Sequence, residues 1–250
     1  MPRPFIRVVD LETTGSQPPA HAVCEVGWQD VEQAEDGSWR VTESRGSTLI
    51  DPRRKIPPVT QAVHHITDED VVGAPLWQHV APTVLKPEGC LALAAHRASF
   101  ERRYCTPQLS GGAAWICTWK SALRLFPDSP GFSNQVLRYW RKPEGLDRDL
   151  GLPVHRAFPD AYVTAHHLRD MLALAAPEDL IAWEREPGLL PRVPRGPDRG
   201  TYWHELPDAS LRTYASDRDQ DIRFSARRAL EARERGEEAA PELPAQSRLL

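Results

Sequence analysis

Two carboxylates at the end of an apolar segment are the first residues with an evident chemical use. Asp10 and Glu12 directly follow the run from Phe5 to Val9. Such a run predicts a strand buried on both faces, and alternate residues of a strand share a side, about 7 Å apart at Cα. Because Mg²⁺ and Mn²⁺ prefer carboxylate ligands, a metal site is one interpretation. The other is a strand that ends in solvated charges before the turn-like segment 13–19.

Two later segments carry further candidates. The segment AAHRASFERR, residues 94–103, follows the apolar run CLALAA and offers His96, Phe100 and Glu101. The segment VHRAFPDAY, residues 154–162, precedes a long helical pattern and offers His155 and Asp160. We expect this His on the approach loop and this Asp to point inward from the helix.

In order and spacing, the three segments resemble the three motifs of the DEDDh 3′–5′ exonucleases. The first motif is D-x-E-T-T-G, found at residues 10–15. The second and third, H-N-x-x-F-D and H-x-A-x-x-D, are matched at residues 96–101 and 155–160. One such hexapeptide is a weak signal, but three in order are specific. The likeness covers about residues 5 to 176 and implies an RNase H-like fold.

The expected fold class is α/β, a mixed central sheet flanked by helices with a small C-terminal helical extension. Alternating patterns predict an antiparallel meander over residues 5–52, whose third strand is STLIDP, residues 47–52. Helical pieces are predicted between Ile66 and Leu85, with Thr67 as the first cap. Strands that then alternate with helices favour helices packed on a central sheet.

The resemblance implies a site for two divalent ions, Mg²⁺ or Mn²⁺. Its ligands would be Asp10, Glu12 and Asp160, with Glu101 holding the second ion, directly or through water. His155 would be the general base, since imidazole titrates near neutrality. Glu101 stands where the family usually has Asp, and its alternative role is that of an ordinary surface charge.

Substrate contacts follow from the same resemblance. Backbone N–H groups of the residues that follow Asp10 and Glu12 would hold the terminal 3′-nucleotide. His64, in the segment HHIT, would lie near the base or sugar of that nucleotide. For His96 a purely structural role is the alternative. Arg97 replaces the usual Asn of the second motif, and Trp115, Trp119 and Trp140 are expected in the core. The expected substrate-binding residues are Leu11, Thr13, Thr14, Gly15, His64, His96 and Phe100.

The leading functional hypothesis is a metal-dependent 3′–5′ exonuclease that releases 5′-mononucleotides from single-stranded DNA. A second hypothesis keeps the fold but takes RNA 3′ ends as the substrate. The sequence does not separate the two sugars, because the choice between ribose and deoxyribose rests on contacts to one 2′-hydroxyl. A third is a catalytically weakened nucleic-acid-binding or clamp-associated adaptor. The net charge of −4 does not exclude nucleic acid, since a local basic groove matters more than the sum.

Four units are predicted along the chain. They are the exonuclease domain 1–176, a Pro/Arg-rich linker 177–200, a small helical module 201–236 without an assigned role, and a disordered tail 237–250. The last residues, QSRLL, resemble a bacterial sliding-clamp motif through Gln246, Leu249 and Leu250.

Composition narrows the remaining classes. No apolar run approaches the roughly 20 residues of a membrane span, and the N-terminal segment lacks the apolar stretch of a signal peptide. The four cysteines form no CxxC pair, so neither a zinc site nor a disulfide framework is indicated. We therefore expect a soluble cytoplasmic protein with no membrane partner.

Overall fold

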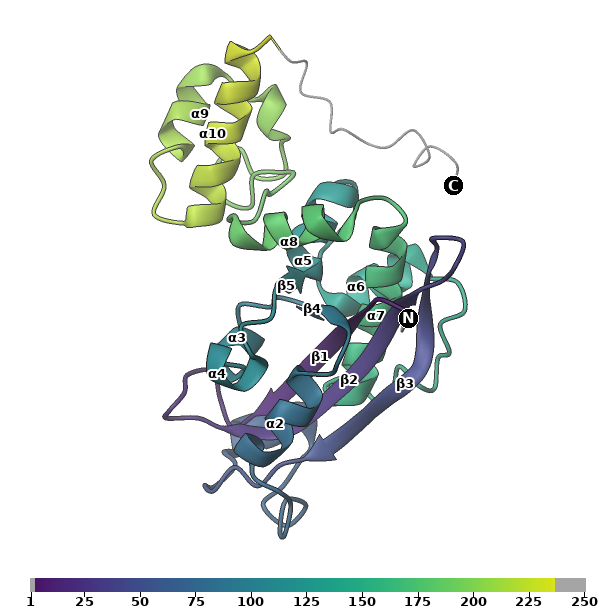
Figure 1. Ribbon diagram of the computed structural model, residues 1–250. Helices are drawn as coiled ribbons and strands as arrows, with labels where there is room; N and C mark the ends of the chain where they lie inside the picture. The colour runs from purple at the N-terminus through teal and green to yellow at the C-terminus, as the bar shows by residue number, and fades with distance from the viewer. Residues whose placement is uncertain (1–2, 237–250) are drawn as a thin grey trace.

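The computed structural model describes residues 3–236 and has a mixed five-stranded sheet at its centre (Figure 1), which confirms the predicted fold class. The strand order is β3-β2-β1-β4-β5. β1 pairs antiparallel with β2 and parallel with β4, so it lies in the middle of the sheet. The strands are β1 (Phe5–Thr13), β2 (Val23–Gln33), β3 (Trp39–Leu49), β4 (Cys90–Ala95) and β5 (Trp115–Cys117).

Two hydrophobic clusters cover the two faces of β1, which explains its uninterrupted apolar run. Ile6 and Val8 belong to one cluster. Val9 and Leu11 belong to the other. Alternate residues therefore enter opposite cores, and the sheet fixes the direction in which the next side chains point.

Helices cover both faces of the sheet. Residues of α5, α6, α7 and α8 complete the core around Ile6 and Val8, and residues of α2 and α3 help complete the core around Val9 and Leu11. The helices of this part are α1 (Pro58–His64), α2 (Trp77–Leu85), α3 (Glu101–Tyr104), α4 (Pro107–Ser110), α5 (Thr118–Leu125), α6 (Asn134–Arg141), α7 (Ala157–Leu172) and α8 (Pro177–Arg185).

The third strand differs from its predicted bounds of 47–52. β3 begins at Trp39 and ends at Leu49, pairing along β2 as an edge strand. Its residues are half-buried or exposed, with no fully buried side chain. Trp39 and Val41 alternate with polar residues and pack against the core around Ile6 and Val8, so the first half of this edge strand carried a signal that the prediction did not use.

The predicted helical cap at Thr67 is also wrong. The Thr67 backbone N–H and hydroxyl both donate to Asp70 Oδ2, at 2.8 and 2.9 Å, within a turn. The nearest preceding helix is α1, which starts at Pro58 and was not predicted. Its signal was the proline itself, since proline favours the first helical position.

Residues 177–185 form α8 instead of the predicted linker. Leu180 is fully buried in the core around Ile6 and Val8, and Glu184 accepts from Arg102 Nη1 at 2.7 Å. Pro177 occupies the start of the helix, where it lacks only an N–H that would be unpaired anyway. The domain therefore extends past residue 176.

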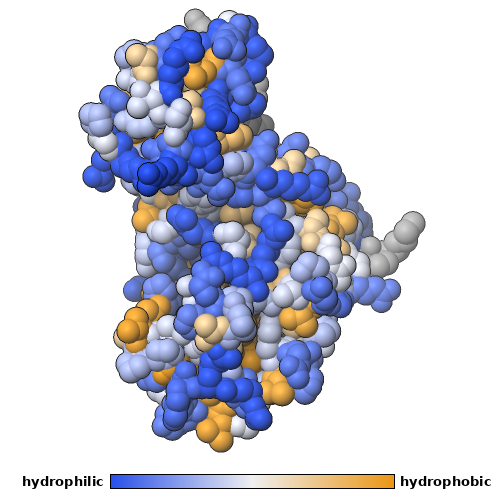
Figure 2. Space-filling model, turned by 90° about the vertical axis from the view of Figure 1, so that its left-hand side faces the viewer, coloured by the Kyte–Doolittle hydropathy of each residue, from blue (hydrophilic) through white to orange (hydrophobic). Residues whose placement is uncertain are grey.

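A separate small core lies beyond α8. It joins Val193, Trp203, Leu206, Leu211, Ile222 and Ala226. The elements of this module are a 3₁₀ turn (Trp203–Glu205), α9 (Asp208–Tyr214) and α10 (Gln220–Glu234), as predicted in outline. Figure 1 shows the module as a lobe beyond α8, and it is the upper lobe of the largely hydrophilic face in Figure 2.

Three further expectations concern the ends and the tryptophans. Trp115 and Trp119 are buried as predicted, but Trp140 is 42% exposed. The predicted tail and its clamp-like QSRLL segment lie outside the described residues. Among residues 3–236 no helix has the length and apolar character needed to cross a membrane.

Candidate active site

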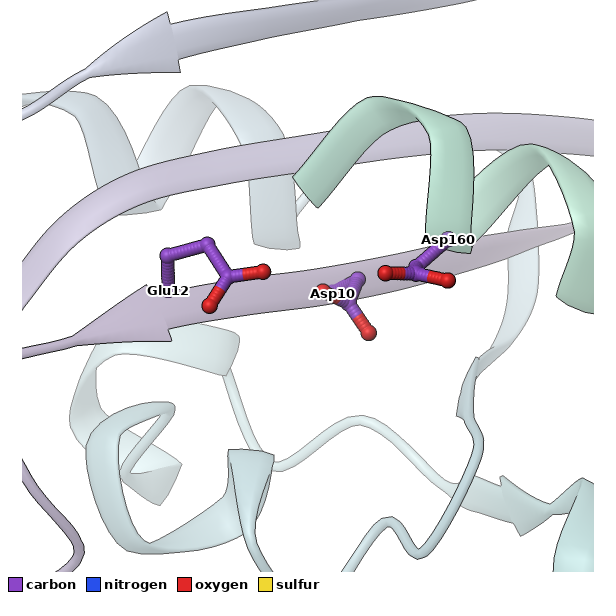
Figure 3. Close-up of side chains that lie close together, drawn as sticks. All are labelled: Asp10, Glu12 and Asp160. Atoms are coloured by element: carbon purple, nitrogen blue, oxygen red, sulfur yellow. The ribbon is translucent and has the colours of Figure 1, made fainter. Parts of the chain in front are cut away.

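Three carboxylates converge at the carboxyl end of β1. Asp10 and Glu12 project from alternate positions of the strand, and Asp160 approaches them from the first turn of α7 (Figure 3). One carboxylate oxygen from each lies within 4.8 Å of the other two. Burial and the neighbouring carboxylates raise the pKa of Asp10 well above its ordinary value and that of Glu12 to about 8. Such a group favours a bound cation, since oxygen ligands suit Mg²⁺ and Mn²⁺.

A glycine lets α7 reach the strands. Gly27 of β2 lies opposite Asp10 in the register. A Cβ at this position would come within 2.2 Å of the backbone of Ala157 and Phe158. Only glycine permits so close an approach, which brings Asp160 beside Asp10.

An ion pair between half-buried Arg156 and buried Glu25 anchors the start of α7. Arg156 Nε and Nη2 donate to the two oxygens of Glu25 at 2.9 and 2.7 Å. The Ala157 N–H donates to the same carboxylate at 3.0 Å. Glu25 is 2% exposed and lies opposite Glu12 in the register of β1 and β2. The sequence analysis missed this pair, because 131 residues separate its members.

Hydrogen bonds orient the Asp160 carboxylate. Oδ2 accepts from the His155 backbone N–H at 2.6 Å, and Oδ1 accepts from Gln135 Nε2 at 3.1 Å. Asn134 Nδ2 donates to the Asp160 carbonyl at 3.2 Å. These donors favour the ionised form, yet burial leaves the pKa of Asp160 raised. Gln135 and Asn134 were not predicted as site residues.

Glu101 faces the same site from α3. Its side chain lines the cavity beside Asp10 and Glu12, and the residue is 3% exposed. Its Oε2 atom has no hydrogen-bond partner within residues 3–236, and burial raises its pKa to about 8. An unpaired buried carboxylate is costly. A cation beside it would remove that cost, so the donor set fits a divalent metal.

His155 lies where a base was predicted. It occupies the loop before α7, lines the cavity and is exposed. Its backbone has a φ of 60°, in the left-handed region that few non-glycine residues adopt. This conformation directs its N–H to Asp160 while its imidazole stays accessible to solvent.

The cavity at these residues has a volume of about 280 Å³. Four of the predicted substrate contacts line it, and α1 adds two residues that the sequence analysis missed, Thr60 and Val63. These two share one helical face with His64, by their spacing of three and four. The lining residues are Asp10, Leu11, Glu12, Thr13, Thr60, Val63, His64, Phe100, Glu101, His155 and Asp160.

The last two residues of the first motif, both predicted substrate contacts, make hydrogen bonds within the protein. The Thr14 N–H donates to the Ala22 carbonyl at 2.8 Å. Its hydroxyl accepts from the Ala22 N–H at 3.0 Å. The Gly15 carbonyl accepts from the Thr13 hydroxyl at 2.6 Å and from the Tyr104 hydroxyl at 2.5 Å. Neither Thr14 nor Gly15 lines the cavity.

The ring of His96 makes contacts within the protein, which favours the structural role over a substrate contact. Its ring nitrogens lie 3.0 Å from the Thr118 hydroxyl and 2.9 Å from the Phe132 carbonyl. Burial lowers its pKa to about 4, so the ring is neutral at pH 7. The next residue, Arg97, lies 4.2 Å over the Trp119 ring, which gives the replacement of Asn a packing role.

Comparisons with known proteins agree with this geometry. The family model described as Exonuclease (RNase_T) matches residues 8–168. Exodeoxyribonuclease 10 of Escherichia coli (strain K12) is 36% identical over 168 residues, which are 67% of this chain and 69% of that protein. The DNA polymerase III subunit epsilon of Treponema pallidum (strain Nichols) is 27% identical over 171 residues, 66% of this chain and 74% of that protein.

A solved structure shares the fold as well. It is exonuclease X in complex with 5′ overhanging duplex DNA, with a TM-score of 0.59 and 31% sequence identity. The match covers 71% of this chain and 98% of that chain. The chain therefore belongs to the exonuclease family of RNase_T type and is a nuclease, similar to exodeoxyribonuclease 10.

Proposed function

We propose that the protein is a metal-dependent exonuclease that removes 5′-mononucleotides from the 3′ ends of single-stranded DNA. The observation that carries this proposal is the convergence of Asp10, Glu12 and Asp160 on one cavity with the unpaired oxygen of Glu101. DNA is favoured because the relatives with more than 30% identity are a named exodeoxyribonuclease and an exonuclease bound to DNA.

Asp10, Glu12 and Asp160 would hold one divalent ion, and Glu101 would help hold a second. When bound, two such ions supply charge neutralisation at the phosphorus and lower the pKa of a bound water. The raised pKa values of the carboxylates suit this role, because a cation stabilises their ionised forms.

His155 is the group that takes the proton of the attacking water. Its exposed imidazole faces the cavity, and its backbone N–H is held 2.6 Å from Asp160. The same residue thus couples the position of the base to the orientation of a metal-binding carboxylate. Gln135 supports this arrangement from the other oxygen of Asp160.

The terminal nucleotide would lie in the cavity, against the wall formed by β1, α1 and Phe100. Leu11 and Thr13 line it from the strand, and Val63 and His64 line it from the helix. Val63 is 45% exposed, so an apolar surface is available for the face of a base or sugar.

The test uses 5′-labelled single-stranded DNA and the matching RNA, with Mg²⁺ or Mn²⁺, and an Asp10→Asn variant as control. A metal-dependent ladder that shortens from the 3′ end and is lost in the variant would support the proposal. Faster loss of the RNA would make the protein an exoribonuclease. Intact strands in both metals, with tight strand binding, would instead support the adaptor hypothesis.

A further inference from the structure

An exposed aromatic face lies on α6. Val136, Tyr139 and Trp140 are 38%, 64% and 42% exposed. Their spacing of three and four residues places them on one side of the helix. Tyr139 and Trp140 are the two aromatic side chains among the exposed large hydrophobic residues of the part of the chain that the structure describes. Adjacent exposed apolar side chains of this kind mark an interaction surface.

This face begins at the active site. Gln135, in the first turn of α6, lies 3.1 Å from the Asp160 carboxylate. Tyr139 is one turn further along the same side of the helix, about 6 Å along its axis. A strand whose 3′ end lies beside Asp160 reaches this distance within about three stacked bases.

The charges nearby favour recognition of bases over phosphates. The segment from the end of α6 to residue 150 holds Lys142 and Arg148 but also Glu144, Asp147 and Asp149, so it has no excess of cations. The guanidinium carbon of Arg138 lies over one face of the Tyr139 ring, 5.5 Å from its centre. Aromatic rings bind bases of any sequence through their faces.

We propose that Tyr139 and Trp140 form a stacking platform for the second to fourth bases of the strand whose 3′ end occupies the active site. The inference rests on the proposed function, because it assigns this surface to the same strand. It adds a binding site on α6, outside the three sequence motifs, which gives affinity without sequence preference.

The test compares the wild-type protein with the variants Tyr139→Ala, Trp140→Ala and the double variant. Affinity for a fluorescent single-stranded DNA is measured by anisotropy with Ca²⁺ in place of Mg²⁺. We expect each single substitution to weaken binding about 5-fold or more, as loss of one stacked base would. The slope of affinity against salt concentration should not change, because no phosphate contact is removed.

Three controls make the result specific. Leu91→Ala, at a 48% exposed apolar residue of β4, should leave affinity unchanged, and Tyr139→Phe should retain it. A strand with abasic sites at the second to fourth positions should bind the wild-type and double-variant proteins equally. Hydrolysis of thymidine 5′-monophosphate p-nitrophenyl ester, which has no further bases, should be the same in every protein.

Two failures can be told apart. If the wild-type protein hydrolyses neither the ester nor DNA, the proposed function fails. The affinities measured by anisotropy would still test the stacking platform, because they do not depend on hydrolysis. If the alanine variants bind intact and abasic strands as the wild-type protein does, the platform is overturned. An altered slope against salt would overturn it as well, since that would mean phosphate recognition.

Discussion

Glu12→Gln should stabilise the metal-free protein while it abolishes metal-dependent activity. Burial and the charges of Asp160 and Glu25 raise the pKa of Glu12 from 4.5 to about 8. The folded protein then holds a proton that the unfolded chain releases, so its stability falls as pH rises from 4.5 to about 8. Glutamine has nearly the same shape and no charge to desolvate.

The size of the effect follows from the pKa values. At pH 7 the unfolded side chain is 2.5 pH units above its pKa of 4.5, while the folded one is still protonated. At 1.36 kcal/mol per unit this costs the wild-type protein about 3 kcal/mol. For a chain of this size the substitution should raise Tm by about 6–10 °C.

Thermal or urea unfolding in EDTA at pH 5, 6, 7 and 8 checks this expectation. The difference in free energy of unfolding between variant and wild type should grow by about 1 kcal/mol per pH unit between pH 5 and 7 and level off near pH 8, where the folded Glu12 also ionises. Glu88→Gln, the same change at an exposed residue, should show no such growth. A variant that is equally or less stable than wild type at pH 7, or a difference independent of pH, would show that Glu12 does not hold its proton in the folded protein.

Substitutions at Gly27, Arg156 and Glu101 test how the site is built. Gly27→Ala should displace the start of α7 and lower kcat at least about tenfold, because its Cβ would meet Ala157 at 2.2 Å; unchanged kcat would contradict the close approach. Arg156→Met should lower the free energy of unfolding by about 2 kcal/mol, since it leaves Glu25 buried and unpaired, and adding Glu25→Gln should restore most of the loss in urea unfolding. Glu101→Gln should reduce the rate at least about a hundredfold, while Glu101→Asp should keep metal-dependent activity within about tenfold of wild type; equal rates in both would show that this carboxylate binds no metal.

The residues that the structure brings together at this site were predictable because they lie in three short motifs whose order and spacing resemble those of a known family. Asp10 and Glu12 share a side of a strand by its period of two, and Asp160 follows a recognisable helix start. The Gly27 contact and the pair of Glu25 with Arg156 were not predictable. Both depend on which surfaces meet after folding, and a single glycine or glutamate in a strand carries no sign of its future neighbour.

Other errors came from elements that are stabilised by their neighbours. The first half of β3 was missed although Trp39 and Val41 alternate with polar residues, because these two side chains are only half-buried and the strand lies at the edge of the sheet beside β2. α8 was included in the predicted linker because the segment 177–200 as a whole is rich in Pro and Arg, although Pro177 suits a helix start. Trp140 was assigned to the core from its residue type alone, and only the orientation of α6 shows that it is exposed.

The place of α8 sets the limits of the portable catalytic unit. Leu180 fills the same core as residues of β1 and α7, and Glu184 is joined to the turn of α3 that begins with Glu101. Truncation at residue 176, where the sequence motifs end, would open this core and leave Arg102 without its carboxylate. For protein engineering, we expect a transferable nuclease to need residues beyond α8 as well, because Leu190 packs against the core around Val9 and Leu11 and Glu186 pairs with Arg124.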